Sequence, residues 1–454
     1  MAARKDLLKA QAFVQQRLVS ALVDREPDSQ VPPLRRLSLG LFVSILVGAL
    51  VVAGFGIYGF LKKPGAGLPK ETAIIVDTEA GVVFVSNGQQ LSPVTNMASA
   101  RLITGGGTIR SVKTAALAGI PRGELYGIPQ APAQLPAASS MTAFPIRICS
   151  IPYSHDSRYT VVDFAAPADR SSTGVVLTDS GGQAYLVVNG LAHLVKPEAK
   201  SAIETTTVPA PATDALIQSL PLGEPIDKIR LKEHGNPARN GHKVGDVVQT
   251  GRREDKSSLS YWIMLADGWS RISYIDMRAT QPDPQSVPEQ EIDAAKSATP
   301  HSSTKGVPLE QTPMTTVDTT QTTICTTYFD GETFPKIQVG TDVPKPSKDS
   351  KDSKDVPPAV SWYDRVTTAP GAGALLRGSN TPADGQSFLI WEGKKYGIPD
   401  PQSRAALGYG DKPPVAAVVE PILRMIPDGL PKGIALDHYH ANRAVSNKEV
   451  GQER

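Results

Sequence analysis

The sequence has few cysteines, few aromatic residues and almost no excess of either charge. Its 454 residues include 2 Cys, 10 Phe, 12 Tyr and 4 Trp, and the formal net charge is +2. Such a balance provides no large basic surface for nucleic acid. The 39 glycines and 39 prolines predict many turns and short strands, so we expect an α+β chain whose larger part is rich in β-structure.

Motifs for catalysis are also missing. The sequence has no GxxxxGK[ST] loop for nucleotide phosphates, no GxSxG and no HExxH. No Cys or His spacing is typical of a metal site. We therefore predict no catalytic residue, no cofactor and no metal, and a protein that is not an enzyme.

One long apolar run is present, from Leu37 to Leu61, and it carries no charged residue. About 20 apolar residues suffice to cross a bilayer, so this run predicts one transmembrane helix. The alternative is a cleaved signal peptide, but its apolar region would be shorter and a small-residue cleavage site would follow. Lys62 and Lys63 follow instead.

Cationic side chains predict the orientation, because Lys and Arg resist translocation. Before the run stand Arg4, Lys5, Lys9, Arg17, Arg25, Arg35 and Arg36, and after it Lys62, Lys63 and Lys70. We expect a cytoplasmic N-terminus, an inner-membrane span and a periplasmic bulk. Within the run, Gly40, Ser44 and Gly48 are spaced for close helix packing, although ordinary glycine content of membrane helices explains them equally well.

The N-terminal tail predicts an amphipathic helix from Lys5 to Glu26, with Leu7, Val14, Leu18 and Leu22 on one face. Pro27, Pro32 and Pro33 are expected to end it before the membrane. Such a helix could lie on the inner leaflet or dock on a cytoplasmic partner, and we favour docking.

Four segments of the exterior share a pattern of strand, two-residue hairpin and strand. The predicted hairpin turns are Asn87-Gly88, Asn189-Gly190, Asp267-Gly268 and the weaker Glu392-Gly393. In three segments a Pro-x-Gly corner follows, at Pro121-Arg122-Gly123, Pro221-Leu222-Gly223 and Pro427-Asp428-Gly429. The third segment lacks this corner and continues into the polar stretch 281–321, which we expect to be unstructured.

Cys149 and Cys325 lie in short strand-like surroundings. An even cysteine count in an exported region predicts one disulfide, and two free buried thiols are the alternative.

The chain resembles the EccB family, a core membrane component of the type VII (ESX) secretion system of actinobacteria. The resemblance rests on QAFVQQRLVSALVDRE, the apolar run after LRRL, LSPVTNMASARLI, ICSIPY, YLVVNG, FLIWEGKKYGIPD and MIPDGLP. It implies a complex with the motor ATPase EccC, with EccD, with EccE and with other EccB copies, near the mycosin protease. It also implies an elongated periplasmic part of repeats around a central core, with a disulfide between Cys149 and Cys325.

These observations predict a structural subunit that links the membrane parts of the secretion complex to a periplasmic assembly. The alternatives are a module that binds the cell wall and an ATP hydrolase, because some family members carry an ATPase label. The expected parts are a cytoplasmic tail (1–36), a transmembrane helix (37–61), repeat lobe 1 (62–130), a core part with Cys149 (131–173), repeat lobe 2 (174–235), repeat lobe 3 (236–280), a loop and core part with Cys325 (281–345), a disordered insertion (346–358), repeat lobe 4 (359–435) and a polar C-terminal tail (436–454).

Overall fold

The fold is known from a computed structural model, which describes most of the chain. The described residues are 2–23, 33–61, 71–152, 157–164, 169–204, 208–251, 258–299, 301, 303–309, 322–340, 365–410 and 412–445. The chain forms two compact units, Met1–Leu68 with Val112–Gly119, and Pro69–Ser111 with Ile120–Arg454. The predicted insertion 346–358, the end of the C-terminal tail and the cations Lys62, Lys63 and Lys70 lie outside the described residues.

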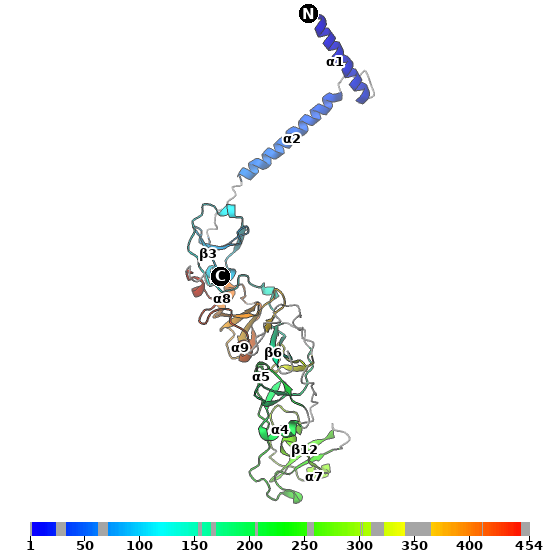
Figure 1. The fold of residues 1–454 in the computed structure, drawn as a ribbon, viewed down its shortest axis with the longest axis vertical. Helices are drawn as coiled ribbons and strands as arrows, with labels where there is room; N and C mark the ends of the chain where they lie inside the picture. Colours follow the sequence, from blue (N-terminus) through cyan, green and yellow to red (C-terminus); the bar gives the residue numbers. More distant parts are fainter. Residues whose placement is uncertain are drawn as a thin grey trace. The chain divides into compact units, whose positions relative to one another are not determined.

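The first unit contains two helices, α1 (Ala2–Val23) and α2 (Pro33–Leu61) (Figure 1). Within α2, Ser38–Tyr58 has a mean hydropathy of 2.4 and no buried side chain. These 21 residues span about 30 Å as a helix, which matches the hydrocarbon core of a bilayer. The helix begins at Pro33, four residues before the apolar run, because proline fits the first turn of a helix. The N-terminal helix α1 ends at Val23, before these prolines, and Pro33 in addition starts α2.

The apolar side chains of α1 are exposed, Leu7 by 71% and Leu22 by 77%. The helix begins and ends three residues earlier than its predicted range, at Ala2 and Val23. Pro27 and Pro32 lie outside the described residues.

The second unit is built on five small sheets, so the chain has the predicted α+β class. The central sheet has five strands in the order β16-β15-β5-β6-β17. Its strands are β5 (Ile146–Pro152), β6 (Arg158–Phe164), β15 (Ile324–Tyr328), β16 (Lys336–Val339) and β17 (Arg365–Thr367). Strands β5 and β6 precede lobes 2 and 3 in the chain, whereas β15 and β16 follow them. We call this sheet the core sheet.

Each of the four lobes contains a four-stranded sheet with the same chain path. Three antiparallel strands are followed by a helix and by a fourth strand that lies beside the first. In lobes 2, 3 and 4 this fourth strand runs parallel to the first. The elements are, in lobe 1, β1 (Ala73–Asp77), β2 (Val83–Ser86), β3 (Leu91–Val94), α3 (Met97–Thr104) and β4 (Ile109–Val112); in lobe 2, β7 (Val175–Thr178), β8 (Ala184–Val188), β9 (Leu191–Leu194), α4 (Pro197–Glu204), β10 (Ala210–Pro211) and α5 (Asp214–Ser219); in lobe 3, β11 (Val247–Thr250), β12 (Ser260–Leu265), β13 (Gly268–Ile272), α6 (Tyr274–Thr280), β14 (Gln285–Ser286) and α7 (Glu289–Asp293); and in lobe 4, β18 (Ala374–Gly378), β19 (Ser387–Trp391), β20 (Lys394–Ile398), α8 (Pro401–Ala406), β21 (Ala416–Val418) and α9 (Glu420–Met425).

The helix after the third strand starts at a capping side chain in three lobes. Asn96, Ser273 and Asp400 each accept a hydrogen bond from the backbone N–H three residues later. Such a cap satisfies one of the free amides of the first turn and stabilises the helix by about 1 kcal/mol. The cap therefore sets the residue at which the helix of each of these lobes begins.

A backbone contact between the third strand and the later corner recurs in all four lobes. One strand residue donates its N–H to the corner and accepts an N–H two residues further along the corner. The strand residue and its two corner partners are Leu91 with Pro121 and Gly123, Ala192 with Pro221 and Gly223, Trp269 with Ala295 and Ser297, and Lys395 with Pro427 and Gly429. The interpretation that lobe 3 lacks the corner was therefore wrong, because Ala295-Lys296-Ser297 makes the same two hydrogen bonds.

The corner glycines are required where a ring lies beneath them. A Cβ on Gly223 would lie 2.3 Å from the His193 ring, and one on Gly429 would lie 2.3 Å from the Tyr396 ring. The residue at this place in lobe 1 is Ser92, whose Oγ would lie 2.4 Å from a Cβ on Gly123, and in lobe 3 it is Ser270, where the corner has Ser297 in place of glycine. Because both hydrogen bonds of the corner use backbone atoms, lobe 3 keeps the contact without the Pro-x-Gly sequence.

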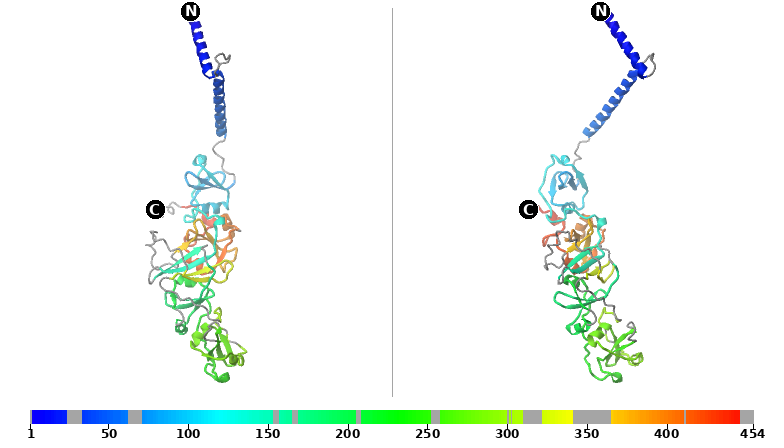
Figure 2. Two further views of the ribbon diagram at one scale, coloured as in Figure 1. Left: turned by 90° about the vertical axis from the view of Figure 1, so that its right-hand side faces the viewer. Right: turned by 45° about the vertical axis from the view of Figure 1, so that its right-hand side comes forward.

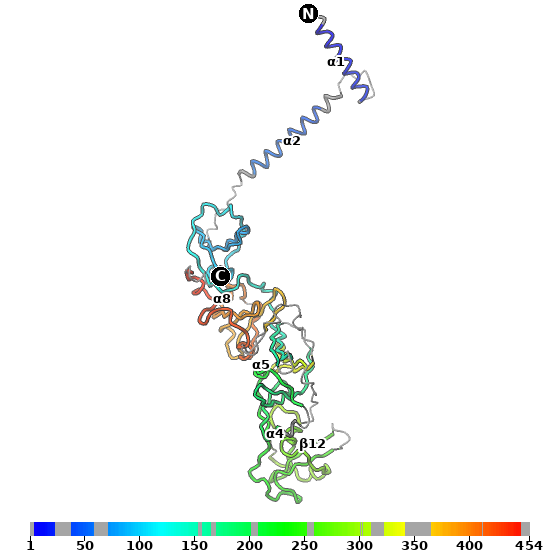
Figure 3. Tube along the Cα trace, viewed as in Figure 1, coloured from blue at the N-terminus to red at the C-terminus, as the bar shows by residue number. Residues whose placement is uncertain are grey.

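Two polar segments are more ordered than their composition predicts. Residues 281–299 contain β14 and α7 and complete lobe 3, so its predicted end at residue 280 was wrong. The C-terminal residues 436–445 belong to the predicted polar tail, but α10 (His438–Ala441) packs on α3. The N–H of Val445 also donates to the carbonyl of Leu125. In both cases, hydrogen bonds with a lobe order a segment that has little apolar surface of its own. Figure 3 shows the C-terminal segment, in red, beside lobe 1.

Shared hydrophobic clusters join the lobes within the second unit. One cluster combines Ala98 and Leu102 of lobe 1 with Leu389 and Ile398 of lobe 4. Another combines Ile148 of the core sheet with residues of lobes 2 and 4. A third combines lobe 2 with Ile275 and Ala279 of lobe 3. The two views of Figure 2 show these neighbours in contact, with lobe 4 in orange beside lobe 1 in blue.

The corner contact predicts a position-dependent effect of alanine. Gly429→Ala should destabilise the protein by about 1–3 kcal/mol, because the new methyl group would overlap the buried Tyr396 ring. Gly410→Ala is the control, since its Cβ would meet its nearest neighbour at 3.9 Å. Denaturant unfolding of both variants checks this expectation, and equal stability of the two would contradict it.

Candidate functional site

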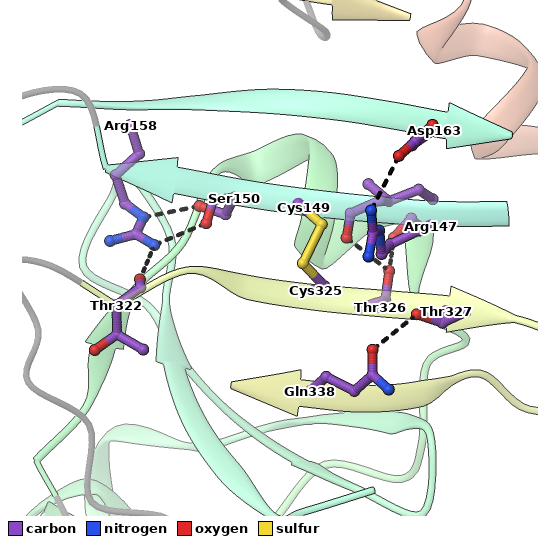
Figure 4. Close-up of a disulfide and its surroundings, with 12 residues drawn as sticks. Arg147, Cys149, Ser150, Arg158, Asp163, Thr322, Cys325, Thr326, Thr327 and Gln338 are labelled. Atoms are coloured by element: carbon purple, nitrogen blue, oxygen red, sulfur yellow. Dashed lines mark hydrogen bonds and ion pairs between the residues drawn. A yellow bond between two sulfur atoms is a disulfide. The ribbon is translucent and has the colours of Figure 1, made fainter. Parts of the chain in front are cut away.

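The two cysteines lie opposite each other on neighbouring strands of the core sheet. Cys149 of β5 pairs with Cys325 of β15 in the antiparallel register, and their sulfur atoms form a disulfide. Both residues are fully buried. Figure 4 shows the disulfide joining the two strands at the middle of the sheet. It closes a loop with a sequence separation of 176 residues, which contains lobes 2 and 3.

A buried ion pair lies beside the disulfide on the β5–β6 side. Arg147 Nη2 donates to Asp163 Oδ2 at 3.0 Å, and these side chains are 7% and 18% exposed. Thr367 Oγ1 of β17 donates to the other carboxylate oxygen of Asp163 at 2.9 Å. Each charge is thus paired and hydrogen-bonded, as a charge in the interior requires. The arrangement joins β5, β6 and β17.

Arg158 lies toward the other end of the pair formed by β5 and β6. Its Nε donates to Ser150 Oγ at 2.8 Å, and its Nη2 donates to the carbonyls of Ser150 at 2.8 Å and Thr322 at 2.6 Å. Burial lowers the pKa of Arg158 to about 10, so the guanidinium remains charged at neutral pH. A cation with three acceptors from β5 and the segment before β15 fixes the pairing of these strands.

Lobe 2 is attached to the core sheet through hydrogen bonds from α5 and the residues beside it. The Thr213 N–H donates to Ser150 Oγ at 3.1 Å, and Thr160 Oγ1 donates to Thr213 Oγ1 at 2.8 Å. The hydroxyl of Tyr328 donates to the Ser219 carbonyl. Burial raises the pKa of the Tyr328 phenol, which therefore stays protonated as a donor. These groups join lobe 2 to the core sheet, and none of them is an exposed nucleophile.

The predicted hairpin residues occupy loops between the second and third strands, but in different ways. Asn189-Gly190 and Glu392-Gly393 form two-residue loops, with φ values of 53° and 75°, and of 50° and 76°. Positive φ at both positions is the geometry that suits a tight hairpin, and Glu392 adopts it despite the unfavourable side chain. The distinction that ranked this last hairpin below the others was therefore wrong.

The other two hairpins differ from the prediction. Ser86 pairs with Leu91, so Asn87 and Gly88 belong to a four-residue loop. The Asn87 side chain accepts the N–H groups of Gln89 and Gln90, which stabilises this longer turn. In lobe 3 the loop residues are Ala266 and Asp267, because Leu265 pairs with Gly268 at the start of β13.

The predicted helix-packing residues Gly40, Ser44 and Gly48 lie at four-residue intervals on α2. No atom outside the helix lies within 4 Å of a Cβ built on either glycine. Ser44 Oγ donates to the carbonyl of Leu41 at 2.8 Å, within its own helix. The three residues thus present a small-residue surface whose packing role remains a proposal.

Among the described residues, no group of three His, Cys, Asp or Glu side chains is arranged to hold a metal ion. The sequence also contains no phosphate-binding loop. The candidate site is the disulfide-linked core sheet with lobe 2 attached to it.

A family model for the type VII secretion system ESX-1, transport TM domain B, matches residues 2–443. The chain belongs to this family, which is the EccB family. The EccB assignment agrees with one apolar helix followed by small sheets.

The curated relatives have low sequence identity to this chain. The chain is 26% identical over 278 residues to the ESX-5 secretion system ATPase EccB5 of Mycobacterium tuberculosis, covering 56% of this chain and 54% of the relative. It is 27% identical over 431 residues to the ESX-2 secretion system ATPase EccB2 of the same species, covering 85% and 84%. The match to EccB5 thus spans about half of that protein.

Solved structures share the fold. A chain of an intact ESX-5 inner membrane complex has a TM-score of 0.62 at 21% identity, with 97% of this chain and 95% of that chain covered. A chain from an EccB3 dimer of the ESX-3 core complex has a TM-score of 0.61 at 20% identity, with 82% and 100% covered. At these identities the likeness establishes the fold.

The disulfide should contribute strongly to stability. A loop of this length restrains the unfolded chain by about 5 kcal/mol in the chain-entropy model. The double variant Cys149→Ala/Cys325→Ala should therefore unfold at a clearly lower denaturant concentration than the wild type.

The control is wild-type protein unfolded in the presence of a strong reductant, which should approach the stability of the double variant. An unchanged midpoint in the double variant would contradict the structural role of the bond.

Proposed function

We propose that this EccB chain is a structural subunit of a type VII secretion membrane complex, in which it links the membrane parts to a periplasmic assembly. The observation that supports this most strongly is the joining of one apolar helix to a disulfide-linked core with four attached lobes. A folded unit that is joined in the chain to a membrane helix can position other subunits.

The proposed orientation places the N-terminus in the cytoplasm and the lobes in the periplasm. More cations precede the apolar run than follow it, including the adjacent Arg35 and Arg36, and short cationic segments remain on the cytoplasmic side. The disulfide supports the same orientation, because such bonds persist in oxidising compartments outside the cytosol.

The proposed partners are other copies of this chain, the motor ATPase EccC, EccD, EccE and, nearby, the mycosin protease. Related chains in solved structures belong to an inner membrane complex and to a dimer, which supports association with further subunits. In the membrane, the surface formed by Gly40, Ser44 and Gly48 suits close approach of another helix.

The membrane contact can be tested with helix variants. Gly40→Leu/Gly48→Leu should reduce the recovery of partner subunits after gentle detergent extraction, because the larger side chains separate the helices. Ala53→Leu serves as the control, because Ala53 lies about two and a half turns from Ser44 and therefore on the opposite face of α2. The measurement is the mass of the purified complex. Full recovery with the double variant would contradict packing through this surface, and wild type recovered only as a monomer would contradict the subunit role.

The proposed role is not catalytic, although the relatives' names include ATPase. We expect the full-length protein, purified without partners in detergent, to release no phosphate from ATP above a buffer blank. The physical reason is that the sequence has neither a phosphate-binding loop nor a motif for the accompanying Mg²⁺. Turnover that copurifies with the chain through successive columns would contradict this.

A further inference from the structure

A short segment after lobe 3 runs back across lobe 2. We call residues 301 and 303–309 the strap. Hydrogen bonds of its backbone and of Thr304 join it to both lobes. To lobe 3 they are His301 N–H to Ser270 Oγ (2.7 Å) and Thr304 Oγ1 to Asp276 Oδ1 (2.6 Å), and to lobe 2 they are Lys305 N–H to Glu224 Oε2 (2.9 Å) and Asn189 Nδ2 to the Gly306 carbonyl (3.3 Å). Val307 is buried in the cluster that joins lobes 2 and 3. The strap therefore couples the two lobes.

Beneath the strap lies His193 of β9, which is fully buried. Its Nδ1 lies 2.8 Å from the carbonyl oxygen of Glu224, at the corner of lobe 2. Two glycines make room for the ring: a Cβ on Gly223 would lie 2.3 Å from it, and a Cβ on Gly306 would lie 3.4 Å from it. The imidazole is thus enclosed between the corner and the strap.

The ring has one satisfied and one unsatisfied nitrogen. Because Nδ1 faces a carbonyl, it must carry the proton and donate it, which leaves Nε2 as the unprotonated nitrogen. Nε2 is buried and has no hydrogen-bond partner among the described residues. A Cβ built on Gly223 would lie 2.9 Å from Nε2 and one built on Gly306 would lie 3.5 Å from it, so this nitrogen is enclosed between the corner and the strap. A second proton would therefore have no acceptor unless the strap moved away.

The charges around His193 raise its pKa, but burial lowers this pKa by more. Burial lowers the pKa of His193, while the hydrogen bond and charge of Glu224 and the charge of Asp276 raise it by less. The strap also carries the charged residue Lys305, whose backbone N–H bonds to Glu224. The enclosed ring is consequently neutral at pH 7, and protonation favours the open state, in which water can solvate the imidazolium.

We propose that His193 is a proton-sensitive latch, whose protonation at Nε2 releases the strap and loosens lobe 3 from lobe 2. The closed state has the lower histidine pKa, so the strap is held fully above the ordinary histidine pKa of about 6.5 and is progressively released as the pH falls below it. In a secretion subunit, such a latch would let acidity outside the membrane change the relation between the two lobes.

Hydrogen exchange of the full chain in detergent at pH 7.5 and 5.5 tests this proposal. After correction for intrinsic exchange rates, the protection of the Thr304, Lys305 and Val307 amides should fall by up to about tenfold at pH 5.5. The corner amides of lobe 4, at Lys395 and Gly429, are the internal control, because Tyr396 takes the place of the histidine there. Their protection should not change.

His193→Gln separates the histidine from the nearby carboxylates. Its amide can still donate to the Glu224 carbonyl but does not titrate, so strap protection should become equal at the two pH values. If this variant fails to fold, Gly306→Ala gives a second reading, since alanine is strained at the φ of 92° found there and should open the strap at both pH values. Equal protection of the wild-type strap at both pH values would overturn the proposal. An acid-induced loss that persists in His193→Gln would also overturn it and would assign the effect to Asp276 or Glu224.

Discussion

The pairing of β5 with β15 is the constraint on which the rest of the second unit depends. These strands come from distant parts of the chain, and the whole of lobes 2 and 3 lies between them in sequence. Without a crosslink, closing such a loop carries a large entropy cost, so a buried disulfide between directly opposed residues is placed where it restrains the chain most. Arg158 then fixes the same strands through its charged hydrogen bonds to the carbonyls of Ser150 and Thr322, while the ion pair of Arg147 with Asp163 joins β5 to β6.

The four lobes cover the edges of their small sheets in the same way. Each uses a helix and a fourth strand to cover one edge, and the corner contact to engage the third strand at the other. The contact uses backbone groups only. Its sequence can therefore vary, as Ala295-Lys296-Ser297 shows.

The features that could be predicted from sequence are those set by local chemistry. The apolar run of α2, the tight turns at Asn189-Gly190 and the Pro-x-Gly corners follow from residues close together in the chain. The pairing of Arg147 with Asp163 was missed, because it depends on strand register. The strap and residues 436–445 were missed as well, since their hydrogen bonds go to partners far away in sequence. No local pattern at His193 signals that a strap will enclose it.

The central claim is that a disulfide-linked body is held outside the cytoplasm by one helix. Protease digestion of intact spheroplasts tests it most directly, followed by electrophoresis with and without reductant. Cleavage between the two cysteines should give fragments containing Cys149 and Cys325 that stay joined until reduction, while a tag at the N-terminus stays protected. Protection of the body, loss of the N-terminal tag or fragments that separate without reductant would contradict the account.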